Sequence, residues 1–179
     1  MSPKIDVPRA TAAAECVVKT HFHLAEFIRE GMTLAQIDAE VARTLDSLRC
    51  KSCFLGYKIP RTPPFPCHAC LSVNDCVVHG TVASHTAPLK EGDIISIDIG
   101  VTHQGWIGDA AWTYAIKSRS EKAKALMDCG IESLRRGIAT MQPGTQLIEF
   151  ARAVQTYVES ESGFHLTRGL GGHGIGRKL

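Results

Sequence analysis

The first third of the chain carries apolar side chains at helical spacing. Between residues 9 and 30 they recur every three or four positions among good helix formers. A second apolar face follows at Leu34, Ile37, Val41, Leu45 and Leu48. Thr33, with Gln36 three positions later, forms a capping-box pattern that marks a helix start. The pattern therefore predicts two consecutive helices, in which His21 and His23 are expected to be solvated or locally hydrogen-bonded.

The middle of the chain changes to the patterns of strands. Apolar pairs flank Asn74-Asp75 in "CLSVNDCVVHG", which is typical of a hairpin and would leave His79 at a strand end. The segments "DIISIDIG" and "AAWTYAI" predict two further strands with a turn around Gly105. A Pro-rich loop, "KIPRTPPFPCHAC", separates these strands from the N-terminal helices.

Two more helices are predicted toward the end of the chain. Ser120 caps one that runs to about Gly137, and the other begins near Thr145. A constant shift along the sequence superposes this pair on the first: Gly31 on Gly144, Leu34 on Leu147, Ile37 on Phe150, Val41 on Val154, Leu45 on Val158 and Cys16 on Cys129. We interpret this as a degenerate internal repeat of two helices and a strand block, with a chance match of helical patterns as the alternative.

Composition and charge narrow the class of protein. A chain of 179 residues has the size of one ordinary domain. Its net charge of +2, with acids and bases interspersed, gives no basic stripe for nucleic acid. Without an apolar run of membrane length or the apolar core of a secretory signal, we expect a cytoplasmic protein that does not contact membranes. Seven cysteines in such a chain indicate thiols or metal ligands rather than disulfides.

Two aspartates stand in apolar surroundings on neighbouring predicted strands. Burying the carboxylates of Asp98 and Asp109 opposite one another is costly unless a proton or a cation lies between them. A divalent metal resolves the repulsion, and oxygen ligands with one imidazole suit Mn, Fe, Co or Zn. His173, between glycines in "GGHGIG", offers that imidazole. The alternative is that Asp98 lies on the surface, Asp109 caps a turn and His173 belongs to a flexible tail.

The cysteines around the Pro-rich loop form a second metal-binding pattern. Two C-x2-C pairs, separated by thirteen residues, are formed by Cys50, Cys53, Cys67 and Cys70. Four thiolates at this spacing predict a tetrahedral structural zinc site that would clip a loop insertion over residues 50–70. The alternative is that the cysteines stay reduced and pack as small apolar groups.

Several segments, in their order and spacing, resemble the type I methionine aminopeptidases, which are metallopeptidases of the pita-bread (creatinase/aminopeptidase) fold. The segments are "VVHG" with His79, "GDIISIDIG" with Asp98, "GWIGDAAWTY" with Asp109, "PGT" with Gly144 and "GGHGIGR" with His173. The resemblance covers nearly the whole chain. It implies an α+β fold with pseudo-twofold halves, carried by a single catalytic domain over residues 1–179, in agreement with the repeat.

The resemblance also implies a role for each matching residue. Asp98 would bind one metal ion, Asp109 would bridge two ions, and His173 would bind the other. His79 would contact the substrate near the scissile bond. The residues at the positions where the family lines its methionine pocket are Tyr57, Phe65 and Cys70.

The reaction implied by the resemblance is removal of the N-terminal methionine from nascent proteins and peptides. A hydroxide held by two divalent ions of Co, Mn, Fe or Zn would attack the first peptide carbonyl. The family also uses a second histidine and two glutamates farther along, for which these 179 residues hold no counterpart. We therefore expect a second half that is truncated at the C-terminus, and a complementary chain or a dimer that supplies the missing ligands.

Two other functions remain open on the sequence. One is a catalytically dead pita-bread remnant that acts as a peptide- or partner-binding module. The other is a related X-Pro peptidase, which only Gly100 in "IDIG" suggests.

Overall fold

The computed structural model describes residues 5–179, and the chain divides into two compact units. The first unit holds the residues up to Ser118 together with His173–Leu179, and the second holds Arg119–Gly172. The sequence had predicted a single domain. No helix within residues 5–179 has an apolar stretch long enough to cross a bilayer.

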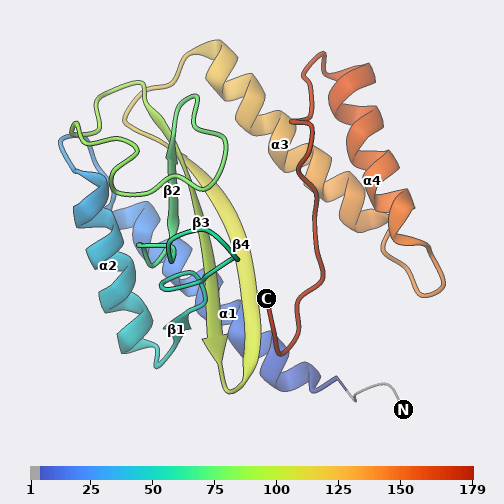
Figure 1. Ribbon diagram of the computed structural model, residues 1–179. Helices are drawn as coiled ribbons and strands as arrows, with labels where there is room; N and C mark the ends of the chain where they lie inside the picture. The colour runs from blue at the N-terminus through green and yellow to red at the C-terminus, as the bar shows by residue number, and fades with distance from the viewer. Residues whose placement is uncertain (1–4) are drawn as a thin grey trace. The chain divides into compact units, whose positions relative to one another are not determined.

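The first unit begins with the two predicted helices (Figure 1). Helix α1 spans Val7–Phe27 and helix α2 spans Leu34–Ser47. The predicted capping box is present at the start of α2, where Thr33 and Gln36 each accept a hydrogen bond from the other's backbone N–H. The inner face of α2 is buried as predicted, at Leu34, Ile37, Val41 and Leu45. Local sequence signals therefore determine both helices.

A four-stranded antiparallel sheet packs beside these helices (Figure 1). Its strands are β1 (Lys51–Ser52), β2 (Cys70–Val73), β3 (Ile94–His103) and β4 (Trp106–Ala115). Strand β3 pairs with all three others, and its pairing with β4 runs along its whole length. The turn between them has left-handed backbone at Gln104 (φ 51°) and Gly105 (φ 76°), as in a type I′ hairpin. The predicted turn around Gly105 is confirmed.

The hairpin predicted around Asn74-Asp75 is wrong in its second half. β2 ends at Val73, and no strand follows until β3. Val77 and Val78 are 53% and 44% exposed, so this apolar pair does not bury one face of a strand. The Asn74 side chain instead accepts a hydrogen bond from the backbone N–H of Ile94 and donates one to Asp93. The turn is therefore bonded to the start of β3.

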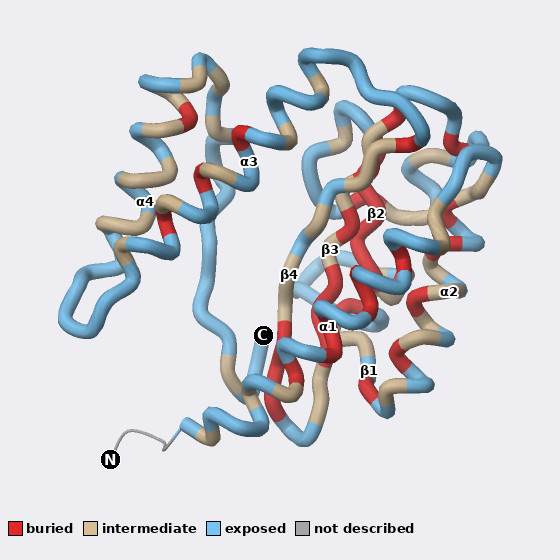
Figure 2. The backbone as a smooth tube through the Cα atoms, turned by 180° about the vertical axis from the view of Figure 1, so that it is seen from behind, coloured by how far each residue is buried: buried red, intermediate tan, exposed pale blue. Residues whose placement is uncertain are grey.

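The β3–β4 hairpin has one face toward the helices and one away from them. The fully buried members of β3 are Ile95, Ile97, Ile99 and Val101, which belong to the core shared with α1 and α2. Figure 2 shows buried positions along β3 and on one side of each of these helices. Because side chains alternate along a strand, Asp98 and Gly100 point to the opposite face. Asp109 pairs with Gly100 and therefore also points away from the helices.

His21 on α1 is buried and bonded to residues of β4, so the prediction that it is solvated or locally hydrogen-bonded is wrong. Its Nε2–H donates to the Ala110 carbonyl at 2.9 Å, and its Nδ1 lies 2.7 Å from the Tyr114 hydroxyl. The imidazole also stacks on Trp112, with ring centroids 4.8 Å apart. Burial lowers the pKa of His21, which favours the neutral ring. Two hydrogen bonds and a stacking contact thus hold α1 against β4.

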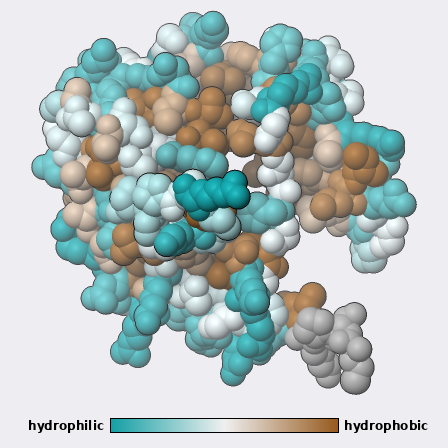
Figure 3. All heavy atoms as spheres, in the orientation of Figure 1, coloured by the Kyte–Doolittle hydropathy of each residue, from teal (hydrophilic) through white to brown (hydrophobic). Residues whose placement is uncertain are grey.

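The second unit contains the two other predicted helices. Helix α3 spans Glu121–Ala139 and is capped by Ser120, as predicted; helix α4 spans Leu147–Gln155 and continues as a π-helical segment, η1, over Thr156–Glu161. The helices approach closely at Gly137, where an added Cβ would lie 2.7 Å from the Phe150 ring. Apolar side chains also reach the surface of this unit, at Ile131, Leu134, Ile138, Met141, Leu147 and Ile148. Figure 3 shows apolar surface areas of this kind among hydrophilic atoms.

Gly108 sets the distance between α1 and β4. A Cβ at this position would lie 2.4 Å from the Ala13 carbonyl oxygen, a backbone atom that cannot rotate away. We expect Gly108→Ala to lower the free energy of unfolding by about 3 kcal/mol. Gly105→Ala meets no atom within 4 Å and should lose only about 1 kcal/mol, because of its positive φ. Denaturant unfolding compares the two, and equal losses would contradict the steric explanation.

Candidate active site

The two aspartates lie on the face of the sheet opposite to helices α1 and α2. Asp98 pairs with Ala111 and Asp109 with Gly100, so the two carboxylates are diagonal neighbours on adjacent strands. Burial, together with the negative charge of Asp98, raises the pKa of Asp109 to about 7. In the absence of a cation, one member of this pair therefore tends to keep a proton near neutral pH.

His173 approaches the same carboxylates from the end of the chain. Its Nε2 lies 3.9 Å from an Asp109 carboxylate oxygen, and its charge opposes the rise in the Asp109 pKa. The backbone N–H of Ile107 donates to the Gly176 carbonyl at 2.8 Å, and the Arg177 guanidinium lies 5.2 Å from the centre of the Trp106 ring. These contacts join the last residues to the start of β4.

The fold thus brings the three predicted metal ligands near one another, but their ligand atoms are too far apart to bind one ion together as they stand. His173 is 61% exposed at its side chain, whereas that of Asp109 is only 14% exposed. Within residues 5–179, single ligand atoms from Asp98, Asp109 and His173 do not all lie within 4.8 Å of one another. The arrangement is a partly buried carboxylate pair with an imidazole at its edge.

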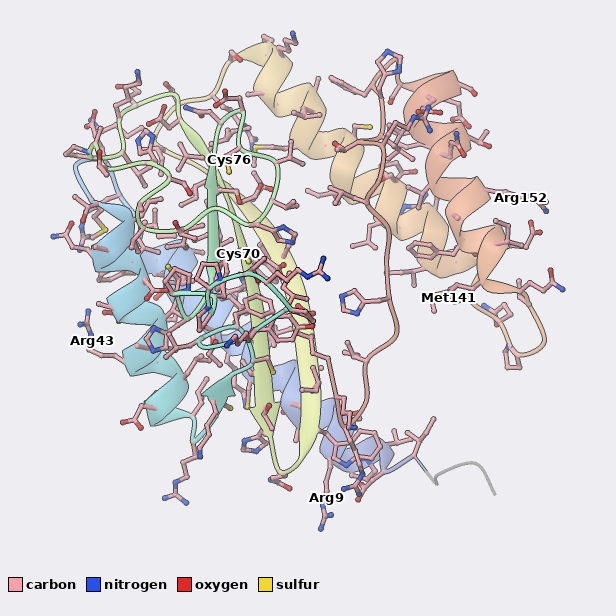
Figure 4. All side chains as sticks on the ribbon, viewed as in Figure 1. Arg9, Arg43, Cys70, Cys76, Met141 and Arg152 are labelled. Atoms are coloured by element: carbon pink, nitrogen blue, oxygen red, sulfur yellow. The ribbon has the colours of Figure 1, made fainter. Side chains whose placement is uncertain are left out.

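Cys70, one of the predicted pocket residues, lies beside the carboxylates. Cys70 is labelled in Figure 4. It pairs with Asp98 across β2 and β3 and is buried. Burial, followed by the charges of Asp98 and Asp109, raises the pKa of its thiol to about 12. Cys70 is therefore a neutral and weakly polar group at neutral pH. The His79 backbone faces this sulfur, and the residue itself is exposed with φ 59°.

An aromatic residue that the sequence reading missed lies on the same face. A Cβ at Gly100 would lie 2.6 Å from the Phe54 ring, so this ring covers the glycine that pairs with Asp109. The predicted pocket residue Phe65 meets Phe54 edge-on, with centroids 6.3 Å apart. The signal that could have identified Phe54 is Gly100 itself, because a glycine inside a strand marks a close approach by another group.

The loop that carries these aromatic residues is closed by backbone hydrogen bonds. Phe65 N–H donates to the Tyr57 carbonyl, and Gly56 N–H donates to the Phe65 carbonyl, both at 2.8 Å. The predicted pocket residue Tyr57 therefore belongs to the same loop as Phe65, and 49% of the residue is exposed.

Asp38 of α2 attaches the far end of this loop to the first unit. Its carboxylate accepts hydrogen bonds from the backbone N–H groups of His68 and Ala69, at 2.7 and 3.2 Å, and lies 2.9 Å from His68 Nδ1. Ser52 Oγ donates to the His68 carbonyl at 2.7 Å. Hydrogen bonds to protein groups therefore anchor the loop that a structural zinc would clip in one of the two interpretations of the cysteine pattern.

The predicted zinc quartet is not assembled. On β3, Thr102 pairs with Lys51, the neighbour of Cys50, and Asp98 pairs with Cys70. Thr102 and Asp98 are four residues apart, so Cys50 and Cys70 are held about 13 Å apart along the strand. Sulfur ligands of one zinc ion lie about 4 Å apart, given Zn–S bonds of about 2.3 Å. The remaining sulfurs have other partners: Cys53 contacts Thr102 at 3.2 Å, and Cys67 accepts a hydrogen bond from Val82 N–H at 3.4 Å.

Residues 9–179 match the model of metallopeptidase family M24, so the chain belongs to this family. It is similar to methionine aminopeptidase B of Synechocystis sp., with 36% identity over 157 residues, which are 88% of this chain and 57% of that protein. With methionine aminopeptidase 1 of Bacillus subtilis it shares 38% identity over 167 residues, 93% of this chain and 64% of that protein. The chain therefore spans about three-fifths of the length of these relatives.

A solved structure agrees with this assignment. The crystal structure of methionine aminopeptidase from Thermotoga maritima superposes with a TM-score of 0.90 at 33% identity, covering 100% of this chain and 69% of that one. The predicted pita-bread fold, mixed α and β with an antiparallel sheet, is confirmed. The predicted resemblance to methionine aminopeptidases is also confirmed.

The carboxylate pair should make the stability of the metal-free protein depend on pH. The Asp109 pKa rises from an ordinary 3.8 to about 7 on folding, so ionisation opposes folding and stability falls as pH rises through this window. We expect Asp109→Asn to raise the free energy of unfolding at pH 8 in chelator and to change it little at pH 4. Denaturant unfolding at both values, with the exposed Asp46→Asn as control, measures this. An unchanged pH slope in Asp109→Asn would contradict it.

Proposed function

We propose that this chain carries out metal-dependent removal of the N-terminal methionine from peptides and nascent proteins. The observation that carries the proposal is the Asp98–Asp109 pair, which shares one face of the sheet with the neutral thiol of Cys70. Membership of metallopeptidase family M24, and similarity to methionine aminopeptidases, support the same reaction.

The residues at the carboxylate pair fit divalent metal ions. Burial and the negative charge of Asp98 raise the pKa of Asp109, and a cation that replaces the proton on Asp109 stabilises the pair. We propose that Asp98 holds one ion, that Asp109 lies between two, and that His173 adds a nitrogen ligand. Oxygen donors with one imidazole suit Co, Mn, Fe or Zn. When bound, such ions lower the pKa of water and stabilise the oxyanion that develops at a peptide carbonyl.

The surroundings of the pair fit an unbranched apolar side chain. Cys70 stays a neutral thiol, and Phe54 places an aromatic ring over Gly100 on the same face. Phe65, packed edge-on against Phe54, and Tyr57 extend this apolar lining in our proposal. A methionine thioether adapts well to such a wall and makes favourable contacts with aromatic edges.

His79 is the proposed contact to the substrate near the scissile bond. Its backbone lies against Cys70, and its side chain is exposed, free to donate a hydrogen bond to a bound peptide.

Release of methionine from a Met-Ala peptide tests the function directly. After chelation, the purified chain should release methionine only when Co(II), Mn(II) or Fe(II) is restored. Asp109→Asn keeps the size of the side chain and removes its charge, so we expect a loss of about 100-fold or more. The exposed Asp46→Asn should leave the rate unchanged.

A folded chain of verified mass that takes up metal and releases no methionine would overturn the proposal. Binding of the peptide without hydrolysis would then favour the binding-module alternative.

A further inference from the structure

A second group of metal-ligating side chains lies on the helix side of the sheet. Single ligand atoms from Cys16, Cys50 and His103 all lie within 4.8 Å of one another. His103 follows Val101 by two residues on β3 and so points toward the helices, opposite to Asp98. It also lies three residues beyond Gly100, the partner of Asp109, which is about 10 Å along the strand. The group is therefore separate from the carboxylate pair.

The backbone fixes each of these residues independently. Cys16 lies on the buried side of α1. Cys50 follows the end of α2, where Arg49 takes a left-handed conformation with φ 56° and the Cys50 N–H donates to the Leu45 carbonyl at 2.8 Å. His103 is the last residue of β3, directly before the two-residue turn to β4. Three elements that are distant in sequence thus present their ligands to one point.

The side chains already contact one another as ligands would. The Cys50 sulfur lies 3.4 Å from His103 Nδ1 and 3.5 Å from the Leu48 carbonyl. The other ring nitrogen of His103, Nε2, lies 3.1 Å from the Gln104 side-chain amide nitrogen, which donates to it. When Nδ1 binds a metal, Nε2 carries the proton, and a half-turn of the Gln104 amide brings its oxygen round to accept that proton and orient the imidazole. The two cysteines are 6% and 7% exposed, whereas His103 is half-buried, so the group has one side toward solvent.

We propose that Cys16, Cys50 and His103 bind one thiophilic divalent ion, for which zinc is the natural choice, with water in a fourth position. Zn–S bonds of about 2.3 Å and Zn–N bonds of about 2.0 Å separate neighbouring tetrahedral ligands by about 3.3–3.8 Å, which the Cys50–His103 distance already matches. Binding converts both thiols to thiolates and releases two protons to solvent, with no change of oxidation state. The ion would link α1, the end of α2 and the end of β3, and so stabilise the first unit.

Cobalt is the probe that distinguishes this site from the carboxylate pair. Thiolate ligands give Co(II) an intense near-ultraviolet charge-transfer band, which oxygen ligands do not. We therefore expect Co(II), added to the reduced and metal-free chain, to produce this band at one equivalent in an Asp109→Asn background, and Zn(II) to remove it. Cys16→Ser and Cys50→Ser should each abolish the band. Cys67→Ser and Cys70→Ser, which alter other buried thiols, should retain it.

A second measurement keeps the test decisive if the cysteine variants do not fold. Zn(II) should raise the Tm of the Asp109→Asn chain, and His103→Gln, which keeps both thiols, should weaken Zn(II) binding by about tenfold or more. A folded chain without the cobalt band would overturn the proposal. So would a band that survives both Cys16→Ser and Cys50→Ser, or a Zn(II)-dependent rise in Tm that His103→Gln leaves unchanged. None of these readouts depends on peptidase activity, so the proposed function can fail while this site stands.

Discussion

The pairing of β3 with its three neighbours is the interaction on which the first unit depends. Every second side chain of β3 is apolar and buried against the helices. The residues between them include Asp98 and Gly100, which face the opposite side of the sheet. A slip of one residue in this register would turn the carboxylates into the core and the isoleucines into solvent. The same pairing brings Cys70 beside Asp98 and places Asp109 opposite the glycine that Phe54 covers. The register of β3 therefore determines both the packing of the core and the grouping of the candidate site residues.

The carboxylate pair shows how a site can be recognised from its electrostatic cost. A buried aspartate beside another aspartate gains nothing for folding, and its raised pKa reflects that penalty. This electrostatic penalty is offset only where the pair binds a cation, a proton or a substrate group. The family assignment agrees with this interpretation, since metallopeptidases of family M24 are the group to which the chain belongs. Stability and the proposed function make opposite demands at Asp109.

The cysteines show the limit of spacing as an argument. Two C-x2-C pairs match a zinc pattern in the sequence, yet the sheet register places their ends about 13 Å apart. The group that the fold does assemble takes Cys50 from that pattern and adds Cys16 and His103, which are far from it in the sequence. Spacing along the chain predicts metal ligands only when a short loop connects them. Across a sheet, strand register decides which sulfurs can meet.

The sequence by itself determined the local elements and much of the candidate site. Thr33 and Ser120 mark their helix starts, Gly105 marks the hairpin turn, and the ordered motifs around Asp98 and Asp109 identify the family, because each signal lies in a few neighbouring residues. Only the tertiary structure decided the burial of His21, the position of Phe54 over Gly100, the loss of a strand after Asn74 and the partners of each cysteine. The physical reason is that helix caps and tight turns depend on short-range hydrogen bonds and backbone conformation. Burial and ligand grouping depend on contacts between elements that the chain brings together only on folding.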